Sequence, residues 1–132
     1  VIRKCLAIDP AAPTPLTIIG DGSQTRTLTH IDDVADGIVA AMGAPAGLHE
    51  DFNIAATEEL SVAEIARLIW EQCGLDPDAF ALEHLPSPEG DVMRRWPDVS
   101  KAERLLDWKA QIGVREGIAQ TAAWLRSTLA PA

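Results

Sequence analysis

The stretch GDGSQTR, residues 20–26, decides how this chain is interpreted. It follows the apolar run 16–19 (LTII) and precedes the alternating run 27–31 (TLTHI), so it connects two segments with the character of strands. Glycine adopts the backbone angles of tight turns without strain, which accounts for the two glycines. A turn does not by itself account for Arg26. One interpretation is therefore a plain turn, and the other is a turn that presents Arg26 to an anion.

The pattern on either side of this stretch predicts a small α/β fold in one domain, residues 1–132. Asp33 suits the first turn of a helix, and Ser61–Glu64 and Ser100–Glu103 both match the capping box that starts a helix. From capping, periodicity and breakers we expect helices over 1–8, 32–42, 61–72, 100–108 and 114–129, and strands over 16–19, 27–31, 52–55 and 80–85. A long polar loop, 86–97, joins the last strand to the next helix.

Composition narrows the classes of function. The chain has 132 residues, 47% of them hydrophobic, which suits one globular domain, and a net charge of −9 that disfavours binding to nucleic acid. No apolar run approaches the ~20 residues of a membrane span, and no leader pattern is present, so we predict a cytoplasmic protein without a membrane partner. Cys5 and Cys73 form no CxxC motif, and we expect them to be unreactive thiols.

The residues that could carry chemistry are arginines in two loops. The sequence contains no tyrosine, no glycine-rich dinucleotide fingerprint, no phosphate-binding P-loop and no HExxH, and its three histidines are isolated from one another. Arg26 ends the glycine-rich turn, and Arg94 and Arg95 lie in the long loop. Guanidinium groups bind phosphates bidentately, so two such loops that converge would suit a diphosphate. Surface arginines are common, and spacing alone leaves both interpretations open.

Four blocks in a fixed order add a resemblance. They are PLTIIGDGSQTRTLTHIDDVADGI, FNIA, ELSVAEIARLI and EGDVMRRWPDVSKAERLLDWKAQIGVREGI, and together they cover nearly the whole chain. In this order they resemble the C-terminal part of the extended short-chain dehydrogenases/reductases, the NAD-dependent nucleotide-sugar epimerases and dehydratases. The resemblance implies the small substrate-binding lobe of such an enzyme, without the N-terminal Rossmann domain. The opening run VIRKCLAI also resembles the end of a helix. We therefore expect this chain to be a fragment or a separated half of a longer enzyme.

The resemblance also implies site residues. The family's arginine in GDGxQxR contacts the nucleotide's phosphates, which here implies Arg26. Thr17 and Ile19, on one face of the preceding strand, would lie beside a uracil or thymine base. Arg95 would reach the diphosphate, and Asp91 of the EGD segment would lie near the ribose. The family aspartate at position 33 is implied to be structural.

The departures from the family leave the substrate open. Pro88 stands where some epimerases have an arginine, Leu28 replaces a frequent aromatic, and Asp107 replaces the glycine of LGW. The Rossmann half and the catalytic Tyr-x-x-x-Lys motif are absent from these residues, so no catalytic residue is assigned and no cofactor is expected to bind this chain alone. NAD is expected in the complete enzyme.

The expected partners are a UDP- or dTDP-sugar and a missing Rossmann domain or partner chain, and a homodimer is left open. The reaction could be epimerisation, dehydration, decarboxylation or reduction. Two other functions remain as alternatives: a standalone, non-catalytic nucleotide-sugar-binding module, and an acidic interaction domain.

Overall fold

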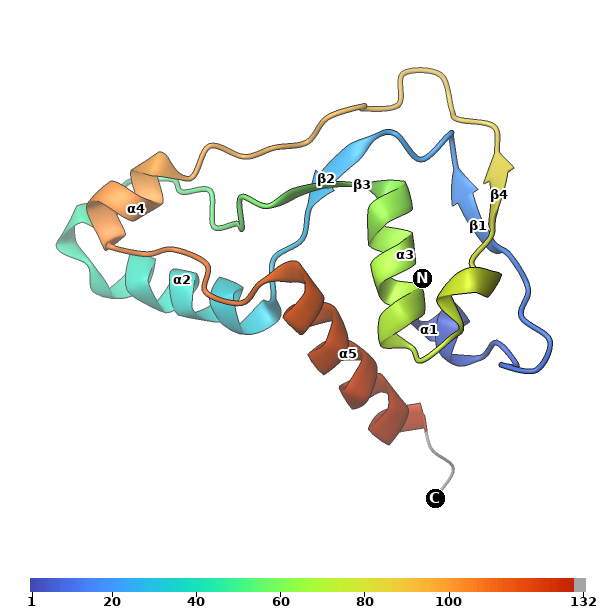
Figure 1. Cartoon of the computed structure of the whole chain (residues 1–132). Coiled ribbons are helices and arrows are strands. Elements are labelled where there is room, and N and C mark those ends of the chain that lie inside the picture. Colours follow the sequence, from blue (N-terminus) through green and yellow to red (C-terminus); the bar gives the residue numbers. More distant parts are fainter. Residues whose placement is uncertain (130–132) are drawn as a thin grey trace.

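The computed structural model describes residues 1–129 (Figure 1), so residues 130–132 of the predicted domain lie outside the described part. The elements, in chain order, are α1 (Ile2–Leu6), β1 (Leu16–Ile19), β2 (Thr25–Thr27), α2 (Ile31–Gly43), the 3-10 turn η1 (Pro45–Gly47), β3 (Glu59–Ser61), α3 (Val62–Gln72), the 3-10 turn η2 (Pro77–Ala79), β4 (Leu82–Leu85), α4 (Ser100–Leu106) and α5 (Val114–Leu129). Helices and short strands alternate, which confirms the predicted α/β class.

The strands form two separate pairs. β1 pairs in parallel with β4, from Leu16 opposite Leu82 to Ile19 opposite Leu85. β2 pairs antiparallel with β3, from Thr25 opposite Ser61 to Thr27 opposite Glu59. Figure 1 shows the β1/β4 pair beside α3, with β2 and β3 leading away toward α2 and α4.

The main core lies where α1, α3 and α5 meet the β1/β4 pair. Trp70 of α3 is fully buried, and its indole N–H donates a hydrogen bond to the Asp76 carbonyl at 2.7 Å. Phe80 meets the Trp70 ring edge-on, with ring centroids 5.7 Å apart. The helix that carries Trp70 begins at the predicted capping box, in which the Ser61 hydroxyl accepts from the Glu64 amide and the Glu64 carboxylate accepts from the Ser61 amide. Sequence therefore fixes the start of α3, and burial of Trp70 holds it in place.

Two predicted strands differ from the structure. Residues 52–55 form neither a helix nor a strand; the third strand in chain order is β3, Glu59–Ser61, which the pattern did not indicate. Asn53 instead donates its side-chain amide to the Asp98 carbonyl at 2.9 Å. The strand predicted over 27–31 is β2, Thr25–Thr27, because only these residues face β3. An alternating pattern indicates where a strand is possible, and pairing with another strand decides whether one forms.

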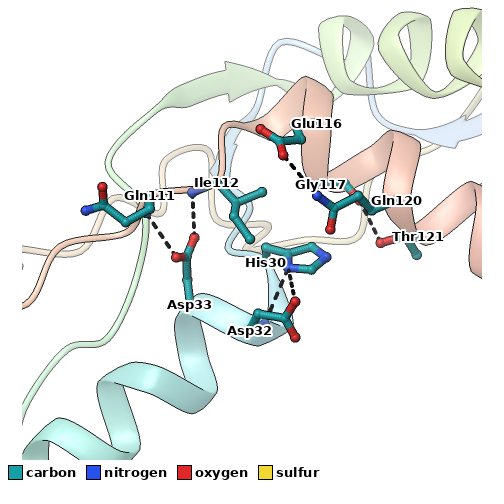
Figure 2. A network of polar contacts seen from close by, with 9 residues as sticks. All are labelled: His30, Asp32, Asp33, Gln111, Ile112, Glu116, Gly117, Gln120 and Thr121. Atoms are coloured by element: carbon teal, nitrogen blue, oxygen red, sulfur yellow. Dashed lines mark hydrogen bonds and ion pairs between the residues drawn. The ribbon is translucent and has the colours of Figure 1, made fainter.

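Two helix starts also differ from the prediction. α2 is capped by His30, whose Nδ1 faces the Asp32 amide at 3.4 Å, and not by Asp33. The buried Asp33 carboxylate accepts instead from the main-chain amides of Gln111 and Ile112, at 3.0 and 2.9 Å (Figure 2). Asp33 is thus structural, as the resemblance implied, but it ties α2 to the segment that leads into α5.

The predicted capping box at Ser100 is wrong. Ser100 is already inside α4, and its amide donates to the Asp98 carboxylate at 2.9 Å. The start of this helix is therefore held by an aspartate two residues before the predicted cap. α4 ends at Leu106, and the following Asp107 adopts a left-handed backbone with φ of 50°.

Candidate functional site

A hollow of about 840 Å³ opens at the carboxyl ends of the parallel strands β1 and β4. In α/β folds, ligands commonly bind beyond the carboxyl ends of parallel strands. The wall of this hollow is formed by Gly20, Asp21, Gln24, His84, Leu85, Pro86, Ser87, Asp91 and Met93. It lies between the glycine-rich turn and the long polar loop, the two loops that carry the arginines.

The glycine-rich turn is fixed from within. Gly20 and Gly22 adopt φ of 76° and 83°, angles that side chains other than glycine's rarely allow. The buried Gln24 side chain donates to the Ile19 carbonyl at 2.7 Å, so it closes the turn over the end of β1. His84 Nδ1 lies 2.9 Å from the Gly20 carbonyl and joins the turn to β4. These contacts hold the floor of the hollow in one conformation.

Arg26 and Asp91, both predicted site residues, meet at the edge of the hollow. Arg26 donates through Nη1 to the Thr25 carbonyl at 2.7 Å, and its Nη2 lies 3.8 Å from Asp91 Oδ1. Asp91 also accepts a hydrogen bond from the Ser87 hydroxyl at 3.0 Å. The guanidinium of Arg26 is therefore partly buried and already oriented, with a carboxylate on one side.

Arg95 reaches the same neighbourhood through its main chain. The Thr25 amide donates to the Met93 carbonyl at 2.7 Å, and the Arg95 amide donates to the Thr25 carbonyl at 3.2 Å. Arg94 thus stands opposite Thr25 in a parallel bridge. Because side chains alternate along extended backbone, Arg26 and Arg95 share one face of this small sheet and Arg94 lies on the other. Met93, on the same side as Arg95, lines the hollow.

On the opposite face, Arg94 is bound by Glu59 of β3. Arg94 Nε and Nη2 donate to the two carboxylate oxygens of Glu59, each at 2.8 Å. The Thr25 hydroxyl donates to the same carboxylate. The hydrogen bonds from Arg94, followed by that from Thr25, lower the pKa of Glu59 to about 2, so this carboxylate is charged at neutral pH.

Thr17 and Ile19 lie together on one face of β1, as the alternation predicted. Their neighbours Leu16 and Ile18 point into the core, while Ile19 is half exposed. The Thr17 hydroxyl donates to Glu83 of β4 at 3.1 Å. As far as residues 1–129 form it, the wall of the hollow includes Asp91 but neither Thr17 nor Ile19. The structure therefore brings Arg26 and Asp91 together and places Arg95 on the same face of the small sheet as Arg26. The two β1 residues lie outside the wall of the hollow.

Sequence reasoning missed four side chains at this site: Gln24, His84, Ser87 and Glu59. The first three line the hollow, and Glu59 holds the loop beside it. Gln24 carried a signal, because it precedes Arg26 by two residues in the glycine-rich block. His84, Ser87 and Glu59 carried none, because their roles depend on segments far apart in the sequence.

Other features of the described residues give weaker indications of a functional site than this hollow. Among residues 1–129, no group of three or more His, Cys, Asp or Glu side chains could hold a metal ion. In that same part of the chain, no helix has the length and apolar character needed to cross a membrane. Burial raises the pKa of the Cys5 thiol to about 11, so at neutral pH it is protonated and a poor nucleophile. A second groove, of about 710 Å³, is mostly apolar and is lined by residues 28–31 and by α5.

Comparison with known proteins agrees with this architecture. The family model described as GDP-mannose 4,6 dehydratase matches residues 2–121. Over 105 residues the chain is 35% identical to UDP-glucuronic acid decarboxylase 4 of Arabidopsis thaliana, and over 116 residues it is 33% identical to UDP-glucuronate 4-epimerase of Thermodesulfobacterium geofontis. These alignments cover 79% and 87% of this chain but only 22% and 34% of the two relatives.

A solved structure of UDP-glucuronic acid 4-epimerase from Bacillus cereus, in complex with UDP-glucuronic acid and NAD, has the same fold over the aligned region. The TM-score is 0.77 at 31% identity, with 87% of this chain and 36% of the epimerase covered. The chain thus spans about a fifth to a third of the curated relatives it matches. It belongs to the GDP-mannose 4,6-dehydratase-type family of NAD-dependent extended short-chain dehydrogenases/reductases, and it matches only part of the length of these relatives.

Proposed function

We propose that this chain is the nucleotide-sugar-binding lobe of an NAD-dependent nucleotide-sugar epimerase or dehydratase. One observation carries the proposal: Arg26 and Arg95 share a face of the small β2 sheet, at the edge of the hollow that Asp91 lines. A guanidinium group can bind two oxygens of a phosphate at once, so two arginines on one face suit a diphosphate. The names of the relatives and of the B. cereus complex support a UDP-sugar as the ligand class.

In this proposal each predicted residue has one task. Arg26 and Arg95 bind the diphosphate, and Asp91 orients Arg26 and accepts a hydrogen bond from a ribose hydroxyl. Thr17 and Ile19, on the open face of β1, lie along a uracil or thymine base. The chain has a net charge of −9, but its distant carboxylates are screened over roughly 10 Å, so the nearby arginines outweigh their repulsion of an anion.

The chain's own residues do not fit NAD. The 132 residues contain no glycine-rich dinucleotide fingerprint and no tyrosine, so polypeptide outside this sequence would hold the cofactor and move the proton. That polypeptide, a Rossmann domain of the same chain or of a partner, is the first partner we propose. The cytoplasmic location stays a prediction, and a homodimer stays open.

The test is calorimetric titration of the purified chain with UDP and with UDP-glucuronic acid. We expect Arg26→Ala to weaken binding by about 1.5–3 kcal/mol, the scale of charge-assisted hydrogen bonds. Arg104→Ala in α4 is the matched control, because Arg104 is exposed and lies on a different element from the hollow. Equal affinity of Arg26→Ala and the unmodified chain would remove Arg26 from the site. No binding of either ligand would favour an acidic interaction domain over the lobe.

Turnover separates the lobe from a standalone binding module. The chain alone is expected to bind UDP-glucuronic acid without converting it, since no residue for hydride or proton transfer is assigned to it. Mixed with an NAD-binding half from a relative, a true lobe should restore conversion of the sugar. Binding that persists without any restored conversion would support the standalone module.

A further inference from the structure

Two adjacent arginines, Arg94 and Arg95, enter the site region, and only one of them faces it. We propose that Glu59 is a positioning residue that selects Arg95 for the anion site by holding Arg94 on the opposite face. This inference rests on the proposed function of Arg26 and Arg95 in binding a diphosphate.

The selection follows from how the loop is attached. Residues 93–95 are joined to β2 by two main-chain hydrogen bonds, both to Thr25. Such a short attachment specifies its register weakly, and a slip of one residue moves every side chain to the other face. After such a slip Arg94 would point toward Arg26, and Arg95 would point away from it. Main-chain bonds alone therefore do not choose between the two arginines.

Side-chain hydrogen bonds to Glu59 determine which of the two arginines faces Arg26. Its carboxylate accepts both hydrogen bonds from Arg94, at 2.8 Å each, and a third from the Thr25 hydroxyl. Thr25 is also the residue to which the loop is attached, so a single carboxylate fixes both members of the bridge. Glu59 stands opposite Thr27 in the β2/β3 ladder, which places it on the same face as Thr25 and Arg94. A residue of β3 therefore sets the register in which the loop pairs with β2.

The ion pair between Glu59 and Arg94 also holds the Arg94 side chain away from the site. Arg94 is compensated by Glu59, and its guanidinium lies over the Trp96 ring at 5.5 Å from the centroid. Arg95 is exposed, and its main-chain amide is the atom that joins it to β2. The difference between the two arginines is therefore one of placement, because both carry the same charge on the same loop.

Substitution of Glu59 by glutamine tests this with an effect of opposite sign to simple electrostatics. Removing a negative charge near an anion site should strengthen UDP binding if charge alone matters. If Glu59 positions the loop, Glu59→Gln should instead weaken UDP binding by about tenfold, the scale of one misdirected charge-assisted hydrogen bond. Glu89→Gln is the matched control, because Glu89 is an exposed carboxylate in the same long loop, and it should leave affinity equal or slightly higher.

A charge swap provides the rescue. In the double variant Glu59→Arg with Arg94→Glu, the ion pair is restored with its partners exchanged, and we expect UDP affinity to return to within about threefold of the unmodified chain. A general loss of structure at position 59 would not be repaired by the second change. If Glu59→Gln melts too early for titration, recovery or failure in the swapped variant decides the question alone.

The outcomes separate the two proposals. Weaker UDP binding by Glu59→Gln with recovery in the swap supports the positioning role. Unchanged or tighter binding by Glu59→Gln, while Arg26→Ala still loses affinity, overturns the role of Glu59 and leaves the proposed function standing. Absence of UDP binding by the unmodified chain contradicts the proposed function and this inference together.

Discussion

At one end of the molecule α1, α3 and α5 pack around Trp70 against the β1/β4 pair. At the other end α2 and α4 both contact η1 (Figure 1), and α2 exposes apolar side chains. We call the first region the packed end. The second, the open arm, comprises α2, η1, residues 48–58 and α4. α2 leaves Ile38, Val39 and Met42 exposed, the last at 83%. A helix with apolar residues on this outer face usually packs against something.

Only the packed end has a large core built by its own elements. The packed end resembles the core of an ordinary domain, in which large apolar side chains are buried by several elements. The open arm has only a small core, completed by Trp108, which follows α4. There Trp108 and Ile54 pack so closely on α2 that a side chain at Gly37 would come within 2.4 Å of Ile54. If the proposed function is correct, the partner polypeptide proposed above is the candidate to cover the exposed face of α2.

The strongest test of the comparison is removal of the Trp70 side chain. Trp70→Ala should lower the free energy of unfolding by about 3–5 kcal/mol, because it leaves a large cavity and an unpaired Asp76 carbonyl. Urea unfolding followed by circular dichroism measures it. Trp124→Ala, a matched change at a residue that is 63% exposed, should cost less than about 1 kcal/mol. Similar losses of unfolding free energy in the two variants would mean that the core around Trp70 does not dominate the stability of the chain.

The second test breaks the link between the two regions. Asp33→Ala removes the carboxylate that accepts from the Gln111 and Ile112 amides (Figure 2), and should cost about 2–3 kcal/mol because two amides lose their partner. Asp33→Asn keeps one acceptor oxygen and should recover part of the loss. Hydrogen exchange in α2 should rise more than in α3 if Asp33 anchors the arm. An equal increase in the exchange rates of both helices would show that the arm does not depend on this contact.

Local signals predicted the packed end better than the arm. The strand 16–19 and the Ser61 capping box depend on neighbouring residues alone, and both are present as predicted. Residues 52–55 have the composition of a buried strand, yet no partner strand pairs with them in the described part of the chain. Asp107 takes the left-handed backbone that the family's glycine would adopt, so the loss of a glycine did not remove the turn.

The sequence pointed to Arg26 and Asp91 at the candidate site, but not to the contacts that they make there. The glycine-rich turn pointed to Arg26 through local chemistry. The Arg26–Asp91 ion pair and the Glu59–Arg94 pair join residues 65 and 35 positions apart, through a loop whose course depends on tertiary pairing. No helical or strand periodicity encodes such contacts. Thr17 and Ile19 share a face, as period two requires, but period two does not say what that face meets.

The third test concerns the uncovered face of α2. Val39→Lys should change the free energy of unfolding by no more than about 0.5 kcal/mol, since the side chain is 68% exposed. It should also reduce self-association of the chain at high concentration, measured by sedimentation velocity, because a charge interrupts the apolar patch. Val92→Lys, at an exposed apolar residue of the long loop, is the control and should leave association unchanged. A chain that is monomeric at every concentration would show that the exposed face of α2 does not drive self-association.

The smallest expected effect lies at the junction of the two regions, where Glu59 binds Arg94. The pKa of Glu59 is lowered from 4.5 to about 2 in the folded chain by its hydrogen bonds from Arg94 and Thr25. A carboxylate whose folded pKa is lowered stabilises the fold above its unfolded pKa, and this contribution fades as the pH falls from 4.5 toward 2. The difference in melting temperature between the unmodified chain and Glu59→Gln should therefore be constant from pH 7 to 5 and narrow below 4.5. The pair is partly exposed, so the difference should also shrink in high salt. A gap that stays constant down to pH 2.5 would mean that Glu59 acts through its shape and not its charge, which would also remove the physical basis of the charge-swap rescue.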